Sequence, residues 1–274
     1  MRAMKIRKSI IAGTWYPGNP RTLRGEIERY IDMAETPQLD GIVALVSPHA
    51  GYVYSGQVAA FGYKLLRGRG IDKAIVLGPS HRVAFRGAVL YGEGGFETPL
   101  GIVETDSDLS GRIAGKDPSI GTSPGAHAQE HSIEIQLPFL QVVLGAFKFV
   151  PVLMGDQGRR TCEALAKAII PLIDEKTILI ASSDLSHYRS YNSAVAIDRV
   201  VVDRVEAMDA DGLLSDLESG RAEACGGGPI VAAIMAARGL KAGKSAILKY
   251  ANSGDVTGDR SQVVGYLSAA FMKG

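Results

Sequence analysis

The chain has 274 residues, of which 46% are hydrophobic and 22% are charged, the balance of a globular protein with a buried core. Its 30 basic and 29 acidic residues give a formal net charge of +1, which argues against a dedicated nucleic-acid or membrane-binding surface. Two cysteines are too few for a disulfide scaffold and are typical of a reducing compartment. We find no signal peptide and no apolar window of membrane-spanning length, so we expect a cytoplasmic protein.

Short apolar runs alternate with segments of helical period along the chain. Continuous rather than alternating apolarity predicts strands that are buried on both faces, as in a parallel sheet covered by helices. The sequence therefore predicts an α/β fold with a mostly parallel central sheet, in a single domain over residues 1–274. We expect helices at 22–33, 132–144, 161–173 and 194–208, and strands at 42–46, 74–77, 147–153, 178–181, 246–250 and 263–271. Residues 87–104 predict a β-hairpin that leaves the main sheet, and Pro151 places the strand at 147–153 nearer an edge.

Three of the five histidines follow predicted strands. His49 ends the segment Val-Ser-Pro-His, His81 ends Leu-Gly-Pro-Ser-His, and His187 ends Ser-Ser-Asp-Leu-Ser-His. Ligands of open α/β sheets bind outside the carboxyl ends of the strands, and neutral imidazoles held there are suitable metal ligands. A lone loop histidine is more often only hydrogen-bonded, but two histidines in matching contexts favour a metal site.

Two further residues can take part in this chemistry. Asp184 lies three residues before His187, where it can orient the imidazole ring or, alternatively, cap the next helix. Cys225 precedes three glycines and a proline, a pattern typical of a tight turn into a helix. A thiol at a helix N-terminus has its thiolate favoured, which makes it a nucleophile or a metal ligand. Cys162, in contrast, lies on an apolar helical pattern and is expected to pack in the core.

His127 and His131 bracket the sequence His-Ala-Gln-Glu-His, which is not the His-Glu-x-x-His motif of zinc proteases. Glu130 and Glu134 are expected to share one face of the predicted helix with His131 nearby, so this segment points toward the pocket. No phosphate-binding loop and no Gly-x-Ser-x-Gly nucleophile elbow occurs in the sequence.

Six separated segments resemble the Memo family in order and spacing, over nearly the whole chain: residues 12–17, 47–52, 77–81, 130–134, 182–188 and 225–229. That family is similar to the class III (LigB-type) extradiol dioxygenases, so the resemblance implies a similar α/β fold. By position, it implies that His49 and His81 are metal ligands and that His187 is an acid/base residue. Cys225 matches the position where the dioxygenases have a carboxylate ligand, and Trp15 matches an aromatic residue of the family's pocket.

The resemblance implies Fe(II) or Cu as the metal, with Zn as an alternative, because a thiolate is a softer ligand than a carboxylate. We expect the remaining candidates to line the pocket or to support the ligands from behind: Asp184, Glu130, His131, Gly226 and Gly227. Prokaryotic members of the family often accompany a radical-SAM protein and an AMMECR-type protein, which implies these as partners.

Three functions follow as hypotheses. The first is a metal-binding protein of redox type, a metal-dependent oxidoreductase if it is an enzyme. The second is a non-enzymatic recognition module that binds a peptide or a small molecule in the same pocket. The third is an active extradiol dioxygenase in which Glu130 or Asp184 replaces the missing carboxylate ligand.

Overall fold

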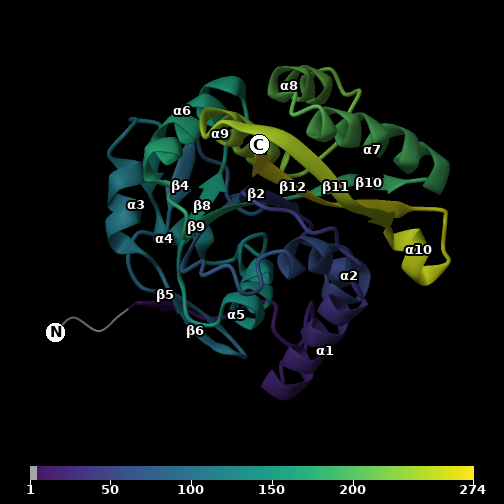
Figure 1. Ribbon diagram of the computed structural model, residues 1–274, viewed down its shortest axis with the longest axis horizontal. Helices are drawn as coiled ribbons and strands as arrows, with labels where there is room; N and C mark the ends of the chain where they lie inside the picture. The colour runs from purple at the N-terminus through teal and green to yellow at the C-terminus, as the bar shows by residue number, and fades with distance from the viewer. Residues whose placement is uncertain (1–4) are drawn as a thin grey trace.

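A computed structural model describes residues 5–274 of the chain (Figure 1). Its main feature is a nine-stranded sheet with the strand order β10-β12-β2-β9-β3-β8-β4-β7, in which β11 also pairs with β12. The central strands are parallel: β2 (Ile42–Ser47), β9 (Thr177–Ser182), β3 (Lys73–Pro79) and β8 (Lys148–Met154). Three of them, β2, β3 and β9, contain the continuous apolar runs of the sequence, and the expected α/β fold is confirmed.

Antiparallel pairs surround this parallel centre, so the sheet as a whole is mixed. The outer strands are β10 (Asp184–Arg189), β11 (Ala242–Asn252), β12 (Val263–Lys273), β4 (Ala88–Leu90) and β7 (Ile120–Thr122). A separate three-stranded sheet has the order β1-β5-β6 and contains β1 (Ile6–Arg7), β5 (Gly95–Thr98) and β6 (Gly101–Glu104).

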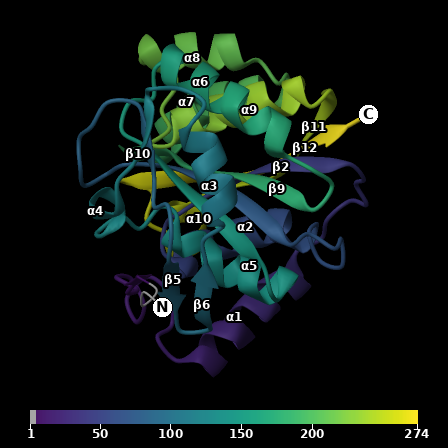
Figure 2. The same ribbon diagram turned by 90° about the vertical axis from the view of Figure 1, so that its left-hand side faces the viewer.

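Helices cover both faces of the main sheet and create two hydrophobic cores (Figure 2). One face carries α6 (Arg159–Ile169), α7 (Tyr191–Glu206), α8 (Ala210–Glu218) and α9 (Gly227–Gly239), together with α3 (Ser107–Ala114). The other face carries α1 (Pro20–Met33), α2 (Tyr52–Lys64) and α5 (Leu137–Leu144). The short elements are α4 (Pro124–His127), η1 (Glu134–Gln136), η2 (Ile170–Leu172) and α10 (Ser253–Thr257).

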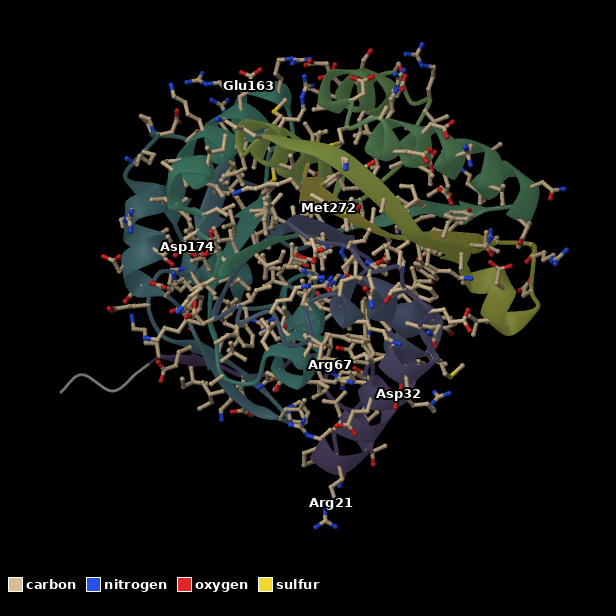
Figure 3. All side chains as sticks on the ribbon, viewed as in Figure 1. Arg21, Asp32, Arg67, Glu163, Asp174 and Met272 are labelled. Atoms are coloured by element: carbon tan, nitrogen blue, oxygen red, sulfur yellow. The ribbon has the colours of Figure 1, made fainter. Side chains whose placement is uncertain are left out.

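Local sequence explains how such a helix forms. Asn19 caps α1 by accepting hydrogen bonds from the backbone N–H groups of Arg21 and Thr22, and Pro20 occupies the first turn. The apolar stripe of α1 packs against the core, whereas charged side chains such as Arg21 on α1 and Glu163 on α6 project outward (Figure 3). Within residues 5–274, no helix combines the length and the apolar character needed to cross a bilayer.

Two details of the sheet refine the sequence-based expectation. The strand at 147–153 lies nearer an edge than β3 and β9 do, but it is not an edge strand, because β4 and β7 lie beyond it. The short strand β4 pairs with Val152 to Met154 of β8. Pro151, which has no backbone N–H to donate, therefore lies outside the antiparallel ladder between β4 and β8, although β8 is an internal strand. The segment 87–104, expected as a hairpin outside the main sheet, belongs to two sheets. Strand β4 joins the main sheet, whereas β5 and β6 form the hairpin in the separate sheet.

The helix expected at 132–144 begins later than the pattern indicated. Regular α-helix starts at Leu137 after the single turn of η1, and Glu130 lies in the loop that precedes it. Glu130 and Glu134 therefore do not share a helical face, and that expectation was wrong. The carboxylate of Glu130 accepts hydrogen bonds from the backbone N–H groups of His131 and Ser132, which stabilises the loop instead of the helix.

Candidate metal centre

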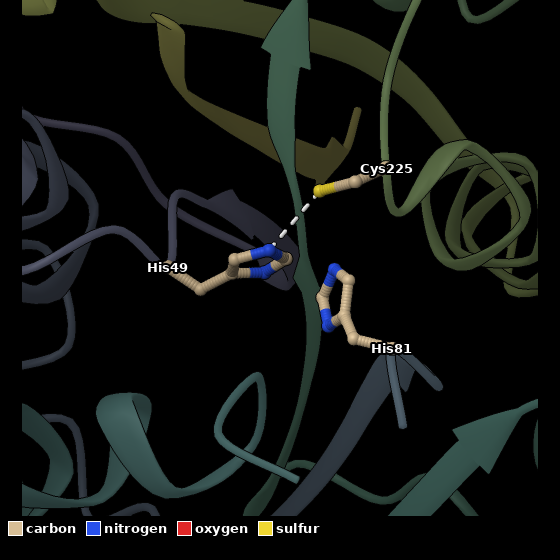
Figure 4. Close-up of side chains that lie close together, drawn as sticks. All are labelled: His49, His81 and Cys225. Atoms are coloured by element: carbon tan, nitrogen blue, oxygen red, sulfur yellow. Dashed lines mark hydrogen bonds between the residues drawn. The ribbon is translucent and has the colours of Figure 1, made fainter. Parts of the chain in front are cut away.

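The carboxyl ends of the parallel strands bring together residues from distant parts of the sequence. His49 follows β2, His81 follows β3, and Cys225 precedes the first turn of α9 (Figure 4). The centres of the His49 and His81 rings are 5.2 Å apart, and the Nε2 atom of His49 lies 3.0 Å from the Sγ atom of Cys225. One ligand atom from each of the three residues lies within 4.8 Å of the other two.

Hydrogen bonds to Ser182 determine the orientation of His49. The Ser182 hydroxyl donates to the carbonyl oxygen of Ser132 and accepts from the side-chain amide of Gln136. Its oxygen lies 3.0 Å from the Nδ1 atom of His49, which must then carry the proton and donate. The unprotonated Nε2 atom of His49 consequently faces the thiol of Cys225.

A carboxylate orients His81 in the same sense. The Nδ1 atom of His81 donates to Oε1 of Glu130 across 2.9 Å, and its backbone N–H donates to Oε2 across 2.6 Å. Burial raises the pKa of Glu130, but the hydrogen bonds from His81 and Ser132 outweigh it and lower that pKa to about 2. An ionised Glu130 thus holds the Nδ1 proton of His81 and leaves Nε2 available as a ligand atom.

His187 shows the same arrangement of protons beside the two ligand histidines. Its Nδ1 atom lies 2.9 Å from the carbonyl oxygen of Leu185, which can only accept, so Nδ1 carries the proton. Burial lowers the pKa of His187, which favours a neutral ring with a free lone pair on Nε2.

The thiol of Cys225 lies in the turn that the sequence indicated, since α9 begins at Gly227 with Gly226 as its N-cap. The expectation of a favoured thiolate does not hold in the metal-free protein, because burial and the nearby Asp184 raise the pKa of Cys225. Gly226 is required here, because a Cβ atom at this position would lie 2.3 Å from the carbonyl oxygen of Ser182. A Cβ atom at Gly227 would lie 2.5 Å from the side chain of Leu217, which would then have to shift.

Asp184 lines the cavity and supports His49, not His187. It begins strand β10, so it caps no helix, and it does not orient His187, whose Nδ1 atom donates to Leu185. Its carboxylate accepts from the backbone N–H of His49 at 2.7 Å and from that of Ala50 at 3.3 Å. Burial raises the pKa of Asp184 to about 7 despite these two hydrogen bonds.

A cavity of about 800 Å³ opens in front of these residues. Trp15, His131 and His187 line it, together with the partly exposed side chains of Tyr54 and Tyr188. The rings of Trp15 and His131 lie 4.4 Å apart, so the aromatic wall is in direct contact with the histidine cluster. Trp15 and His131 therefore lie beside the candidate ligands.

Two other candidates lie outside this centre. His127 is buried with its Nε2 atom 3.2 Å from the carbonyl oxygen of Val89, and burial lowers its pKa to about 3. Cys162 is fully buried in the core beneath α9, as its apolar pattern indicated. Ser182 and Gln136 were not recognised as site residues, because nothing local in their sequence separates them from ordinary polar positions.

The donor set fits a soft first-row metal. Two imidazole Nε2 atoms and a thiol sulfur face one space, and hydrogen bonds behind His49 and His81 fix the tautomer that a metal requires. A second group of candidate ligand atoms comes from His81, Glu130 and His131. There the carboxylate oxygens already accept hydrogen bonds from His81, His131 and Ser132, so this group is less available to a metal.

Comparisons with known proteins identify the family of this chain. The family model described as Memo-like protein matches residues 7–270. MEMO1 family proteins of Methanopyrus kandleri and Methanothermobacter thermautotrophicus are each 40% identical to this chain, over 98% and 95% of it and over 99% and 98% of their own lengths. The solved structure of an uncharacterized Escherichia coli K12 protein is similar in fold alone, with a TM-score of 0.55 at 14% identity over 83% of this chain and 99% of that one. Because both the family model and these relatives span nearly the whole sequence, the chain belongs to the Memo family.

Proposed function

We propose that this Memo family protein binds Fe(II) or Cu, with Zn as an alternative, through His49, His81 and Cys225. The observation that carries the proposal is the common orientation of the two imidazoles. Ser182 and Glu130 each hold a proton on Nδ1, so that both Nε2 lone pairs are directed away from their supports. Isolated histidines in loops have no need of such matched support.

Fe(II) or Cu held by these three residues would supply a redox-active, Lewis-acidic centre beside the cavity, whereas Zn would supply a Lewis acid alone. The chain itself provides the surroundings for a ligand. Trp15 and the tyrosines offer an apolar wall for a small molecule or a peptide, and His187 offers a proton acceptor at Nε2. We therefore propose redox-type chemistry on a ligand bound in this cavity, with His187 accepting or returning a proton.

The test is an anaerobic titration of the chain with Fe(II), Cu(I) and Zn(II), followed by desalting and metal quantification. We expect stoichiometric binding by the wild type and its loss in Cys225→Ala. Cys162→Ala is the matched control, because it removes the other cysteine of the chain from a site in the core. Absence of retained metal in the wild type, or equal binding by the two variants, would refute the proposed ligand set.

A second candidate function is recognition of a ligand without catalysis. The observation in its favour is the aromatic rim of the cavity, where Tyr54 and Tyr188 remain 42% and 71% exposed. This function requires that ligand binding persists in His49→Ala and His81→Ala, whereas the metal proposal requires both variants to lose metal. Calorimetry of these two variants with a ligand found for the wild type separates the two functions.

A further inference from the structure

Arg7 is a buried cation that supports the candidate metal site from behind. Its side chain is only 3% exposed, and its guanidinium lies over the ring of Phe96, 4.7 Å from the centroid. Nε donates to the carbonyl oxygen of His127 and Nη2 donates to that of Glu130, each across 2.6 Å. Arg7 thereby holds two points of the loop that carries Glu130 and His131.

The partner of Arg7 is Glu134, whose side chain is fully buried. Oε2 of Glu134 lies 2.5 Å from Nη1 of Arg7, and Oε1 accepts from the hydroxyl groups of Ser9 and Tyr16 at 2.6 and 2.7 Å. The carboxylate also accepts from the backbone N–H groups of Ile10 and Ile11. With this many donors the buried charge is well compensated.

These contacts connect two segments that meet at the cavity. Glu134 binds the backbone of Ile11, and the carbonyl oxygen of Ile11 accepts from the backbone N–H of Trp15. Arg7 binds the backbone of Glu130, and the carboxylate of Glu130 orients the ring of His81. One ion pair therefore lies behind both the aromatic wall and a candidate metal ligand.

The separate three-stranded sheet explains how Arg7 reaches this place. In β1, Arg7 pairs with Phe96 of β5, which presents the guanidinium to the loop at 127–134. The neighbouring residue, Lys8, forms an exposed ion pair with Glu97 of the same sheet. That pair has the same charges and lies beside the same strand β1, but it forms no ion pair with Glu134, so it provides a matched control.

We propose that Arg7 and Glu134 are positioning residues that set the geometry of Glu130, His81 and Trp15 in the metal-binding cavity. The inference rests on the proposed metal site, but the ion pair also acts on Trp15, which a metal-free measurement can detect. Because a purely structural ion pair would affect stability alone, the test must separate folding from local geometry.

The experiment replaces the buried pair by apolar residues of similar volume, in the double variant Arg7→Met/Glu134→Leu. Removing both charges together is less destabilising than removing one partner alone, although the replacement also removes the hydrogen bonds to both segments. Trp15 is the only tryptophan of the chain, so its fluorescence in the metal-free protein reports on the aromatic wall. Co(II) titration, followed through the thiolate-to-metal absorption band, reports on the candidate ligands.

We expect the double variant to unfold cooperatively, to show a shifted Trp15 emission, and to bind Co(II) about tenfold to a hundredfold more weakly than the wild type. Arg7→Lys retains the charge but lacks the planar fork, so it should show a smaller change in the same direction and serves if the double variant does not fold. The control Lys8→Met/Glu97→Leu should match the wild type in both measurements.

A folded Arg7/Glu134 variant with wild-type emission and wild-type Co(II) affinity would overturn the inference. If the wild type binds no Co(II), the metal proposal fails by itself. The emission of the metal-free variants then still decides the positioning role: a shift supports it, and an unchanged spectrum overturns it.

Discussion

The His49 side and the His81 side of the candidate metal centre are built alike but carry different charge. Each histidine follows a parallel strand, and each donates its backbone N–H to a buried carboxylate, Asp184 for His49 and Glu130 for His81. Within residues 5–274, the carboxylate of Asp184 accepts one further hydrogen bond, from the backbone N–H of Ala50. Glu130 accepts three more, from the ring of His81 and from two backbone N–H groups of its own loop.

The difference teaches that the number of donors, and not burial alone, decides the charge of an enclosed carboxylate. Burial raises the pKa of both groups, but only at Glu130 do the donors reverse the effect. At neutral pH the His81 side therefore holds a fixed anion. On the His49 side, the neutral hydroxyl of Ser182 accepts from the ring, and the carboxyl group of Asp184, which accepts from the backbone, is partly protonated at this pH.

The largest expected effect comes from Glu130→Gln. An amide cannot satisfy all four donors, so we expect metal affinity to fall by roughly tenfold to a hundredfold. The free energy of unfolding should fall by about 1.5–3 kcal/mol, since hydrogen bonds to a charged group are lost. Metal titration and urea denaturation at pH 7 measure the two effects. Asp184→Asn is the corresponding change on the His49 side. Equal losses of metal affinity and of stability in Glu130→Gln and Asp184→Asn would contradict the difference between the two sides.

A smaller effect is expected from pH at Asp184. Its pKa is about 7 in the folded protein, above the value of an unfolded aspartate, so the folded state binds the extra proton. Its contribution to stability is present below about pH 4 and is lost as the pH rises toward 7. Asp184→Asn should therefore gain stability relative to the metal-free wild type as the pH rises from 4 to 7, by roughly 3 kcal/mol.

Thermal or urea unfolding of both metal-free proteins between pH 4 and pH 8 checks the sign of this change. Unfolding of Glu130→Gln and the wild type, measured from pH 6 down to about pH 2, should show the opposite trend. The pKa of Glu130 is about 2 in the folded protein, below that of an unfolded glutamate. Its contribution to stability is therefore present above about pH 4.5 and is lost as the pH falls toward 2. A constant difference between Asp184→Asn and the wild type across the range would contradict the raised pKa.

The smallest expected effect on metal binding comes from Ser182→Ala. The hydroxyl that holds Nδ1 of His49 is neutral, and a neutral hydrogen bond contributes only about 1 kcal/mol. Metal affinity should therefore fall by less than about tenfold, and by less than in Glu130→Gln. Metal titrations of the two variants side by side measure the ratio of their affinities. A greater loss of affinity in Ser182→Ala than in Glu130→Gln would contradict this prediction.

Much of the candidate site could be predicted from the sequence because it depends on local patterns. Continuous apolar runs specify buried parallel strands, whose carboxyl ends must meet at one edge of the sheet. That rule alone places His49 and His81 together. The three glycines and the proline after Cys225 similarly specify a turn into a helix, as found at the start of α9.

Only the tertiary structure decided which atoms face one another. Cys225 reaches the Nε2 atom of His49 across 176 residues of sequence, and Asp184 binds the backbone of His49 rather than the nearby ring of His187. The role of Arg7 could not be predicted from the sequence, because no motif or hydrophobic period distinguishes it from the other basic residues near the N-terminus. The physical reason is that sequence periodicity reports which side of an element is buried, whereas hydrogen-bond partners are chosen by the packing of elements that are far apart in the chain.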